Sequence, residues 1–157
     1  MTEPSVKRSS SEIQIVVFDL GEERYGLDIA AVYEIIRHQP ITAVPRSPAF
    51  VEGIINLRGW VTPLLSLRAL LGIPGEQEDR FIVICRHRGL QIGLMINAVS
   101  TMYLASGDEL EWNVEGNVGV SAHLLLGLYK SGERLISILS IDNLVHGVLQ
   151  GGGSSHA

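Results

Sequence analysis

The chain has 157 residues, which is enough for one ordinary domain or two very small ones with a buried core. Its formal net charge of −5 argues against electrostatic binding to nucleic acid or to anionic lipid. The single cysteine, Cys85, excludes an internal disulfide, and its apolar neighbours predict a buried, unreactive thiol in a reducing cytoplasm.

The chain is expected to begin with a disordered, serine-rich arm over residues 1–12, which lacks the apolar core of a signal peptide. Residues 13–20 are largely apolar, residues 21–24 form a polar break that starts with glycine, and residues 25–29 are again mostly apolar. This pattern predicts a β-hairpin. Residues 30–37 follow as a short helical or irregular segment.

The segment over residues 45–59 is the most distinctive part of the chain. Two prolines stiffen its beginning. Its apolar residues have the spacing of one helical turn, namely Phe50, Val51, Ile54 and Ile55. Residues 56–59 then predict a tight turn, in which Gly59 can take a positive φ. Arg58 is thereby expected on a rigid turn with apolar side chains around it.

A strand is predicted over residues 60–67. Its Pro63 cannot donate a hydrogen bond to a neighbouring strand, which favours a place at a sheet edge or at a bulge. Residues 67–71 predict a short helical turn that ends at Gly72.

The chain contains an internal repeat. With an offset of 67 residues, Gly26 aligns with Gly93, and with an offset of 74, Gly53 aligns with Gly127. The extra residues fall within an acidic loop over residues 104–120. Two halves of the chain therefore share one pattern of strands.

The halves are predicted to be two small barrels, one over about residues 13–75 and the other over about residues 80–149. Each half holds several short strands broken by glycine turns within about 65 residues, which suits a small barrel. Composition and spacing therefore predict an all-β fold with two subdomains. Residues 89–107 are uncharged and long enough to cross a bilayer, but they align with a charged segment of the first half, which argues against a membrane span. Residues 150–157 are expected to be a flexible tail.

Residues that could support catalysis or bind a metal are scattered. No histidine, cysteine and carboxylate cluster has the spacing of metal ligands, so neither a metal site nor a cofactor is predicted. The segment over residues 119–123 resembles a nucleophile elbow around Ser121, but His123 replaces its last glycine, and a plain Gly/Ser loop is favoured. An enzyme remains an alternative if Ser121 and His123 meet an acid from elsewhere. Binding of single-stranded nucleic acid would need basic grooves with stacking aromatic residues, whereas the aromatic residues here are scattered among acidic turns.

Residues 53–68, Gly-Ile-Ile-Asn-Leu-Arg-Gly-Trp-Val-Thr-Pro-Leu-Leu-Ser-Leu-Arg, resemble the signature of the CheW family, the adaptor proteins of bacterial chemosensory arrays. Upstream segments over residues 25–35 and 44–50 match the family as well, and the likeness covers roughly residues 13–149. The family usually has aspartate where Ser66 stands, and often where Asn97 stands. Both residues are expected to form structural hydrogen bonds.

The resemblance implies two five-stranded SH3-like barrels with a hydrophobic seam and short helical turns. It also implies a non-catalytic adaptor that couples chemoreceptors to a CheA-type histidine kinase, in the cytoplasm at membrane-associated receptor arrays. The expected partners are the kinase's regulatory domain and the cytoplasmic tip of the receptors, with no nucleic acid and no direct membrane insertion. A barrel adaptor of a pilus or second-messenger pathway is the alternative.

The resemblance further implies which residues bind. Val32, Glu34 and Arg58 are the expected receptor contacts, with Glu34 paired to Arg58. A second group is expected to bind the kinase or to shape the loops, namely Ile29, Gly53 and Gly59. The residues themselves leave other readings open, because Ile29 and Ile36 would also suit the seam, and Arg58 could be an ordinary surface arginine.

Overall fold

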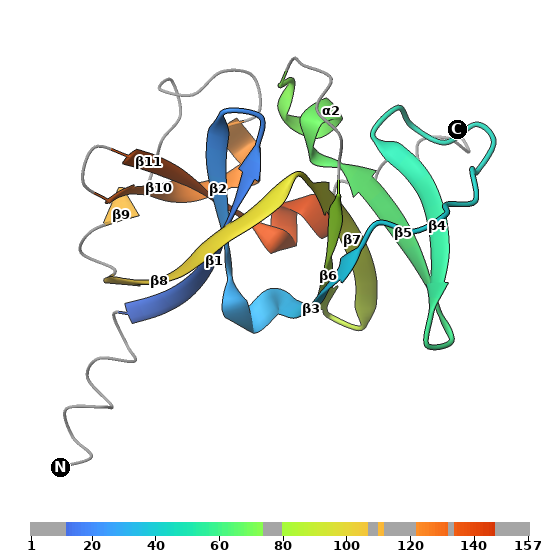
Figure 1. Cartoon of the computed structure of the whole chain (residues 1–157), viewed down its shortest axis with the longest axis horizontal. Helices are drawn as coiled ribbons and strands as arrows, with labels where there is room; N and C mark the ends of the chain where they lie inside the picture. Colours follow the sequence, from blue (N-terminus) through green and yellow to red (C-terminus); the bar gives the residue numbers. More distant parts are fainter. Residues whose placement is uncertain (1–11, 74–79, 107–109, 112–121, 132–133, 147–157) are drawn as a thin grey trace, which may run out of the picture.

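The computed structural model describes residues 12–73, 80–106, 110–111, 122–131 and 134–146, and these residues form mainly β-strands (Figure 1). The predicted all-β class is confirmed. The strands are β1 Glu12–Leu20, β2 Glu23–Asp28, β3 Val32–Arg37, β4 Val51–Leu57, β5 Trp60–Ser66, β6 Phe81–His87, β7 Leu90–Ile96, β8 Ala98–Ser106, β9 Leu110–Glu111, β10 Leu125–Ser131 and β11 Arg134–Leu139. The short helices are η1 Ile29–Ala31, α2 Leu67–Leu71, η3 Ala122–Leu124 and a final helical segment over residues 141–146.

The strands form two sheets that lie side by side (Figure 1). We call the five-stranded sheet barrel I; its strand order is β3-β6-β7-β5-β4. We call the other sheet barrel II; its order is β8-β1-β2-β11-β10, with the two-residue strand β9 added at its edge. The two orders are equivalent, because β6 and β7 repeat β1 and β2, while β8, β10 and β11 repeat β3, β4 and β5. The internal repeat of the sequence is therefore also a repeat of the strand pairing.

Each barrel takes strands from both halves of the chain. The hairpin β6–β7 of the second half lies in barrel I, and the hairpin β1–β2 of the first half lies in barrel II. The parallel pairs β5·β7 and β11·β2 join the exchanged strands. The predicted boundary near residues 75–80 thus separates the two repeats but not the two barrels, and the predicted barrels over residues 13–75 and 80–149 are wrong in this respect. The exchange pairs strand edges that either half alone would leave exposed.

Apolar side chains form one core inside each barrel and a larger core between them. Barrel I encloses Ile55, Leu64, Ile82, Ile84 and Met95. Barrel II encloses Ile15, Val17, Tyr129, Ile136 and Ile138. The third core takes side chains from both sheets, from α2, from η3 and from the final helical segment, and it includes Phe18, Leu27, Leu67, Val83, Cys85, Leu94, Leu124, Leu139 and Leu144. This third core is the hydrophobic seam that was predicted.

Two serines make the same kind of hydrogen bond, one at the start of α2 and one at the start of the final helical segment. The Ser66 hydroxyl accepts from the Ala69 backbone N–H at 3.2 Å, and the Ser140 hydroxyl accepts from that of Asn143 at 3.1 Å. Asn97 also has a structural role, because its side-chain oxygen accepts from the Gly21 backbone N–H at 2.6 Å. The prediction that Ser66 and Asn97 form structural hydrogen bonds is confirmed.

Two predictions of local structure were wrong for one reason, which is that a β-bulge interrupts the alternation of a strand. Residues 51–57 form β4 rather than a helical turn, and its bulge lies between Val51 and Gly53. Residues 32–37 form β3 rather than an irregular segment, and its bulge lies between Val32 and Glu34. The extra residue of a bulge turns the side chains that follow it to the other face of the strand. The apolar residues then no longer alternate along the sequence, and their spacing resembles that of a helix.

Strand β5 lies inside the sheet between β7 and β4, so of the two positions predicted for Pro63 the sheet edge was wrong, while a bulge of the β4–β5 pair does lie nearby, between Val51 and Gly53. Pro63 is paired with Ile54, whose backbone N–H and C=O bond to Thr42 on the other side of β4. Pro63 therefore needs no N–H toward β4. Its nitrogen faces the β7 side, where the pairing begins only at Leu64.

Four predicted features lie wholly or mostly outside the described residues: the N-terminal arm up to residue 11, the acidic loop over residues 104–120, Ser121, and the tail over residues 150–157. Residue 12, which the prediction assigned to the arm, is the first residue of β1.

Candidate binding site at the mouth of barrel I

Two arginine-glycine hairpin turns lie at the same end of barrel I (Figure 1). Arg58 and Gly59 connect β4 to β5 with φ of 51° and 86°, and Arg88 and Gly89 connect β6 to β7 with φ of 53° and 80°. Two consecutive positive φ values are typical of tight two-residue hairpins. Because β5 and β7 are parallel, the turns that precede them lie at one end, which we call the mouth of barrel I.

The bulge in β3 directs two consecutive side chains toward the mouth. Val32 is paired with Cys85 and Glu34 with Ile84, so Tyr33 is the extra residue. Tyr33 and Glu34 both lie opposite Ile84 and turn to the same face of the sheet. Val32 lies on the other face, where it contacts the seam. The bulge thus separates Val32 from Glu34, although the sequence grouped them.

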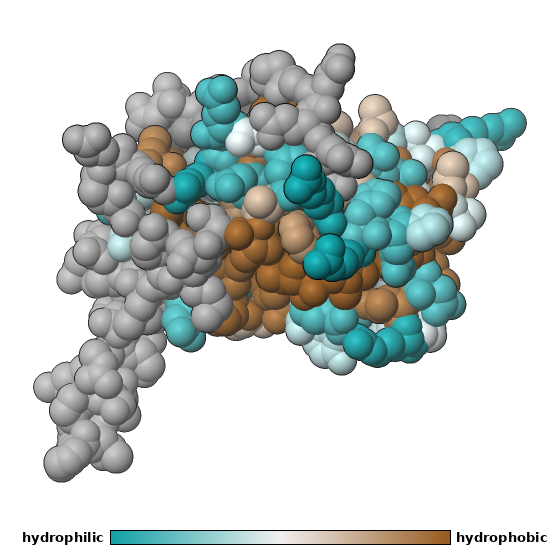
Figure 2. Space-filling model, viewed as in Figure 1, coloured by the Kyte–Doolittle hydropathy of each residue, from teal (hydrophilic) through white to brown (hydrophobic). Residues whose placement is uncertain are grey.

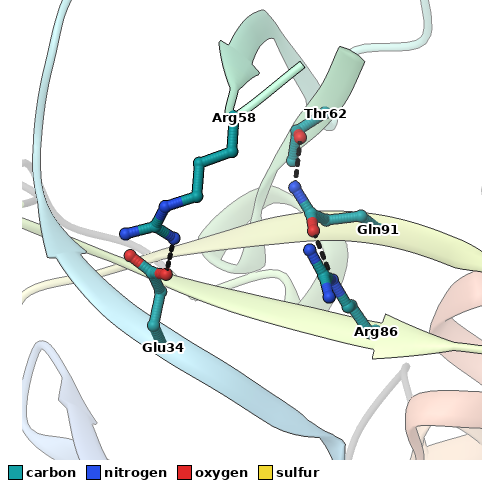
Figure 3. A network of polar contacts seen from close by, with 5 residues as sticks. All are labelled: Glu34, Arg58, Thr62, Arg86 and Gln91. Atoms are coloured by element: carbon teal, nitrogen blue, oxygen red, sulfur yellow. Dashed lines mark hydrogen bonds and ion pairs between the residues drawn. The ribbon is translucent and has the colours of Figure 1, made fainter. Parts of the chain in front are cut away.

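Glu34 and Arg58 form the predicted ion pair, with Arg58 Nη1 donating to Glu34 Oε1 (Figure 3). The Arg58 side chain is 58% exposed and the Glu34 side chain 25% exposed. The hydrogen bond to Glu34 and its charge raise the pKa of Arg58 above its already high value. Asn56 fixes the turn itself, because its side-chain oxygen accepts from the Gly59 N–H at 3.0 Å. The structure therefore presents a permanently charged guanidinium on a rigid turn.

Beside this pair lies a chain of hydrogen bonds around Arg86 (Figure 3). Arg86 Nε donates to Gln91 Oε1 at 2.6 Å, and Gln91 Nε2 donates to Thr62 Oγ1 at 2.8 Å. Thr62 donates in turn to the backbone oxygen of Trp60 at 3.0 Å. Thr62 and Gln91 are buried, so the chain of bonds fixes Arg86 to the inside of the barrel.

Two aromatic rings also contact Arg86. Its guanidinium carbon lies 3.5 Å from the centre of the Tyr33 ring and 4.5 Å from that of Trp60. Tyr33 and Trp60 are themselves 45% and 40% exposed, so the group lies at the surface. The sequence analysis missed Arg86, Tyr33 and Trp60. Their only signal in the sequence is the repeat, since the equivalent positions, Asp19, Ser100 and Arg134, hold other types of residue.

Of the other predicted residues, Gly59 follows Arg58 directly in the turn, whereas Ile29 and Gly53 lie in other elements. Ile29 is half-buried in η1. Gly53 has φ of 153°, and a Cβ there would lie 2.4 Å from the backbone oxygen of Thr42. Gly59 has open space around it, so its positive φ is what the turn requires. Ile36 contacts the core inside barrel I, so the interpretation that placed it in the seam was wrong.

The family model of the CheW-like domain matches residues 14–148. The chain belongs to the CheW-like domain family. It is 32% identical over 136 residues to the chemotaxis protein CheW of Thermotoga maritima, with 85% of this chain and 88% of that protein covered. It is 29% identical over 134 residues to the chemotaxis protein CheW of Klebsiella aerogenes, with 84% and 81% covered.

Among solved structures, this CheW-like domain is similar to the scaffolding protein TtCheW from Thermoanaerobacter tengcongensis. The two are 34% identical with a TM-score of 0.74, and the match covers 82% of this chain and 84% of that one. The SH3-like barrels implied by the resemblance are confirmed by this likeness together with the two sheets.

One face of the CheW-like domain carries a continuous apolar area. Figure 2 shows it in the middle of the molecule, over the region where β1, β8, η1 and β3 meet in Figure 1. Ile35 of β3 is 36% exposed and Val99 of β8 is 39% exposed. Val32 and Val99 are equivalent positions of the repeat. An aliphatic surface of this kind suits contact with another protein.

Reactive groups elsewhere in the CheW-like domain have structural surroundings. Burial raises the pKa of Cys85 to about 12, so its thiol is a poor nucleophile. In the part of the chain that the structure describes, no three histidine, cysteine or acidic side chains could hold a metal ion together. No helix among the described residues combines the length and apolar character needed to cross a bilayer.

Proposed function

We propose that this CheW-like domain is a non-catalytic chemosensory adaptor. It couples chemoreceptors to a CheA-type histidine kinase and helps to assemble their signalling arrays, in the cytoplasm at the membrane. Its relatives are named chemotaxis proteins, and its structural neighbour is a scaffolding protein. The observation that carries the proposal for this chain is Arg58, which is exposed, permanently charged and held by Glu34 on a rigid hairpin turn.

The receptor contact consists of Val32, Glu34 and Arg58. The cytoplasmic tip of a chemoreceptor offers a helical hairpin, and helices bind in this way when aliphatic surface meets a few directing charges. Val32 packs against the seam at the start of β3, a strand that borders the apolar area of Figure 2, while Glu34 and Arg58 lie at the mouth of barrel I (Figure 3). The receptor therefore crosses from the apolar area to the mouth, and Glu34 holds Arg58 in the direction of its partner.

The kinase contact involves the kinase's regulatory domain, with Ile29, Gly53 and Gly59 as binding or loop-shaping residues. Gly53 and Gly59 have no side chain to offer, so their part is to shape the loops around β4. No nucleic acid and no membrane insertion takes part. Individual contacts of this kind are weak, and their repetition in an array makes the assembly stable through effective concentration.

The test of the proposal is the Arg58→Ala variant. Binding of the cognate receptor-tip fragment and of the kinase's regulatory domain is measured by calorimetry, together with thermal unfolding. We expect receptor binding to be lost and unfolding to change little, because exposed ion pairs add little stability. Arg46→Ala is the matched control, since Arg46 is another exposed arginine with positive φ, and it should bind as the original chain does. Unchanged receptor binding by Arg58→Ala, or a collapse of its melting temperature, would contradict the proposal.

A further inference from the structure

We propose that Arg86 is a second recognition contact at the mouth of barrel I, which binds a carboxylate side chain of the receptor tip next to Arg58. The inference rests on the proposed function, because that function supplies the partner. It adds the chemistry of the contact, which is a bidentate pair between the guanidinium fork of Arg86 and an aspartate or glutamate.

The geometry leaves Arg86 two free donors. Its Nε is engaged by Gln91, and the rings of Tyr33 and Trp60 lie against the guanidinium. The two Nη nitrogens make no hydrogen bond to a described residue, and neither is sealed from solvent. A ligand must therefore approach along the guanidinium plane toward these nitrogens, and a carboxylate has the matching pair of acceptors.

The charge of Arg86 has no acidic partner within the described part of the chain. Arg58 is paired with Glu34, and Arg88 lies 3.6 Å from a carboxylate oxygen of Asp142, but no ion pair of Arg86 is found among the described residues. The protein has a net charge of −5, yet two guanidinium groups, those of Arg58 and Arg86, lie near each other at this mouth (Figure 3). The mouth thus complements an acidic segment, although the protein as a whole is acidic.

Arg86 is also held in place before any partner binds. The buried Gln91 and Thr62 fix its Nε, and the two rings restrict its remaining rotation. Binding a partner therefore costs little of the side-chain entropy that a free arginine loses. The same contacts tie β3, which carries Glu34, to the start of β5 at Trp60, so the two arginines keep a fixed spacing. That spacing makes the pair selective for a partner with suitably placed groups.

The experiment measures binding of the cognate receptor-tip fragment to the full chain by titration calorimetry. We expect Arg86→Gln to weaken binding about tenfold or more, as removal of one partner of a close interfacial charge pair does. Arg86→Lys keeps the charge and the ring contact but loses the guanidinium fork, so its affinity should lie between those of the original chain and of Arg86→Gln. It also provides the test if the glutamine variant folds poorly. Arg46→Gln is the matched control, because it removes the same charge from an exposed turn outside the mouth, and it should change the affinity by less than about twofold.

The carboxylate is identified by replacing each aspartate and glutamate of the fragment with its amide. One replacement should weaken binding to the original chain and have no further effect on Arg86→Gln, which shows that the two groups interact directly. If Arg86→Gln binds like the original chain, or if every acidic replacement is additive with it, the inference is wrong. The proposed function would survive that result if Arg58→Ala still loses binding. Absence of any binding by the original chain would contradict both.

Discussion

The two barrels share a frame and differ at their mouths. They have the same strand order, the same bulge in their third repeated strand and the same close glycine contact inside the core. The shared bulges lie at Tyr33 in β3 and at Ser100 in β8, and the glycines are Gly93 in β7 and Gly26 in β2. Because these features set the backbone and the cores, their repetition shows what the fold itself requires.

The mouths differ in chemistry. Arg86 and Gln91 of barrel I correspond to Asp19 and Arg24 of barrel II, which form an ion pair at 3.5 Å. In barrel II the two opposite charges neutralise each other, whereas in barrel I the Arg86 guanidinium lies against two exposed aromatic rings. By sequence, Ser100 and Arg134 take the places of those rings. The asymmetry within a symmetric frame therefore coincides with the binding surface that we propose at the mouth of barrel I.

The largest effect is expected at Gly53, which lies in β4, the strand that leads to the Arg58 turn. Gly53→Ala should lower the free energy of unfolding by roughly 2–4 kcal/mol, since an alanine Cβ would meet the Thr42 backbone oxygen at 2.4 Å and φ is 153°. Gly59→Ala is the control, because its Cβ would meet nothing within 4 Å and only the positive φ costs energy, about 1 kcal/mol. Urea unfolding measures both. Equal losses of unfolding free energy in the two variants would contradict this prediction, because they would show that the Thr42 backbone moves away from the added methyl group at no cost.

The second prediction compares the equivalent glycines directly. A Cβ at Gly93 would lie 2.5 Å from Leu64 Cδ2 and 2.8 Å from Ile82 Cγ2, whereas the nearest atom to a Cβ at Gly26 would be Ile138 Cδ1 at 3.1 Å. Gly93→Ala should therefore cost about 1–3 kcal/mol of unfolding free energy, and Gly26→Ala should stay within about 1 kcal/mol of the original chain. The measurement is again urea unfolding. A larger loss at Gly26 would mean that barrel II has the less adaptable core.

Sequence patterns predicted the parts of this comparison that depend on neighbouring residues. The break at Gly21 and the alternation around it predicted the first hairpin, and Gly72 predicted the end of α2, where it takes φ of 68°. The repeat offsets predicted that both halves would have equivalent strands. These signals are local because turns and caps depend on single residues whose backbone preferences are strong.

The mouth could not be predicted in the same way, because distant strands create it. Pairing of β3 with β6 brings Tyr33 to Arg86 across more than fifty positions of sequence, and no local pattern encodes that partner. The bulge is equally hidden, since alternation alone puts Val32 and Glu34 on one face. The family resemblance supplied the Glu34–Arg58 pair. It could not supply Arg86, whose surroundings follow from the aromatic residues of this chain.

The smallest predicted effect concerns a hydrogen bond between barrel I and the final helical segment that the repeat does not copy. His87 Nε2 lies 2.9 Å from Asp142 Oδ1, and it joins the β6–β7 hairpin to the final helical segment. The equivalent positions of the first half, Leu20 and Arg68, cannot form such a pair. The hydrogen bond from His87 and the charge of Arg88 lower the pKa of Asp142.

A lowered carboxyl pKa means that the folded protein favours the charged form. The stabilisation is therefore fully present above the ordinary aspartate pKa, about 3.9, and it is lost as the pH falls through the lower folded value. Titration of the Asp142 carboxyl by NMR should show this lowered pKa in the original chain. His87→Ala should bring it back toward the ordinary value, and Arg88→Gln should do so by a smaller amount. If both variants leave the Asp142 pKa where it was, the hairpin and the helical segment do not interact through this carboxylate.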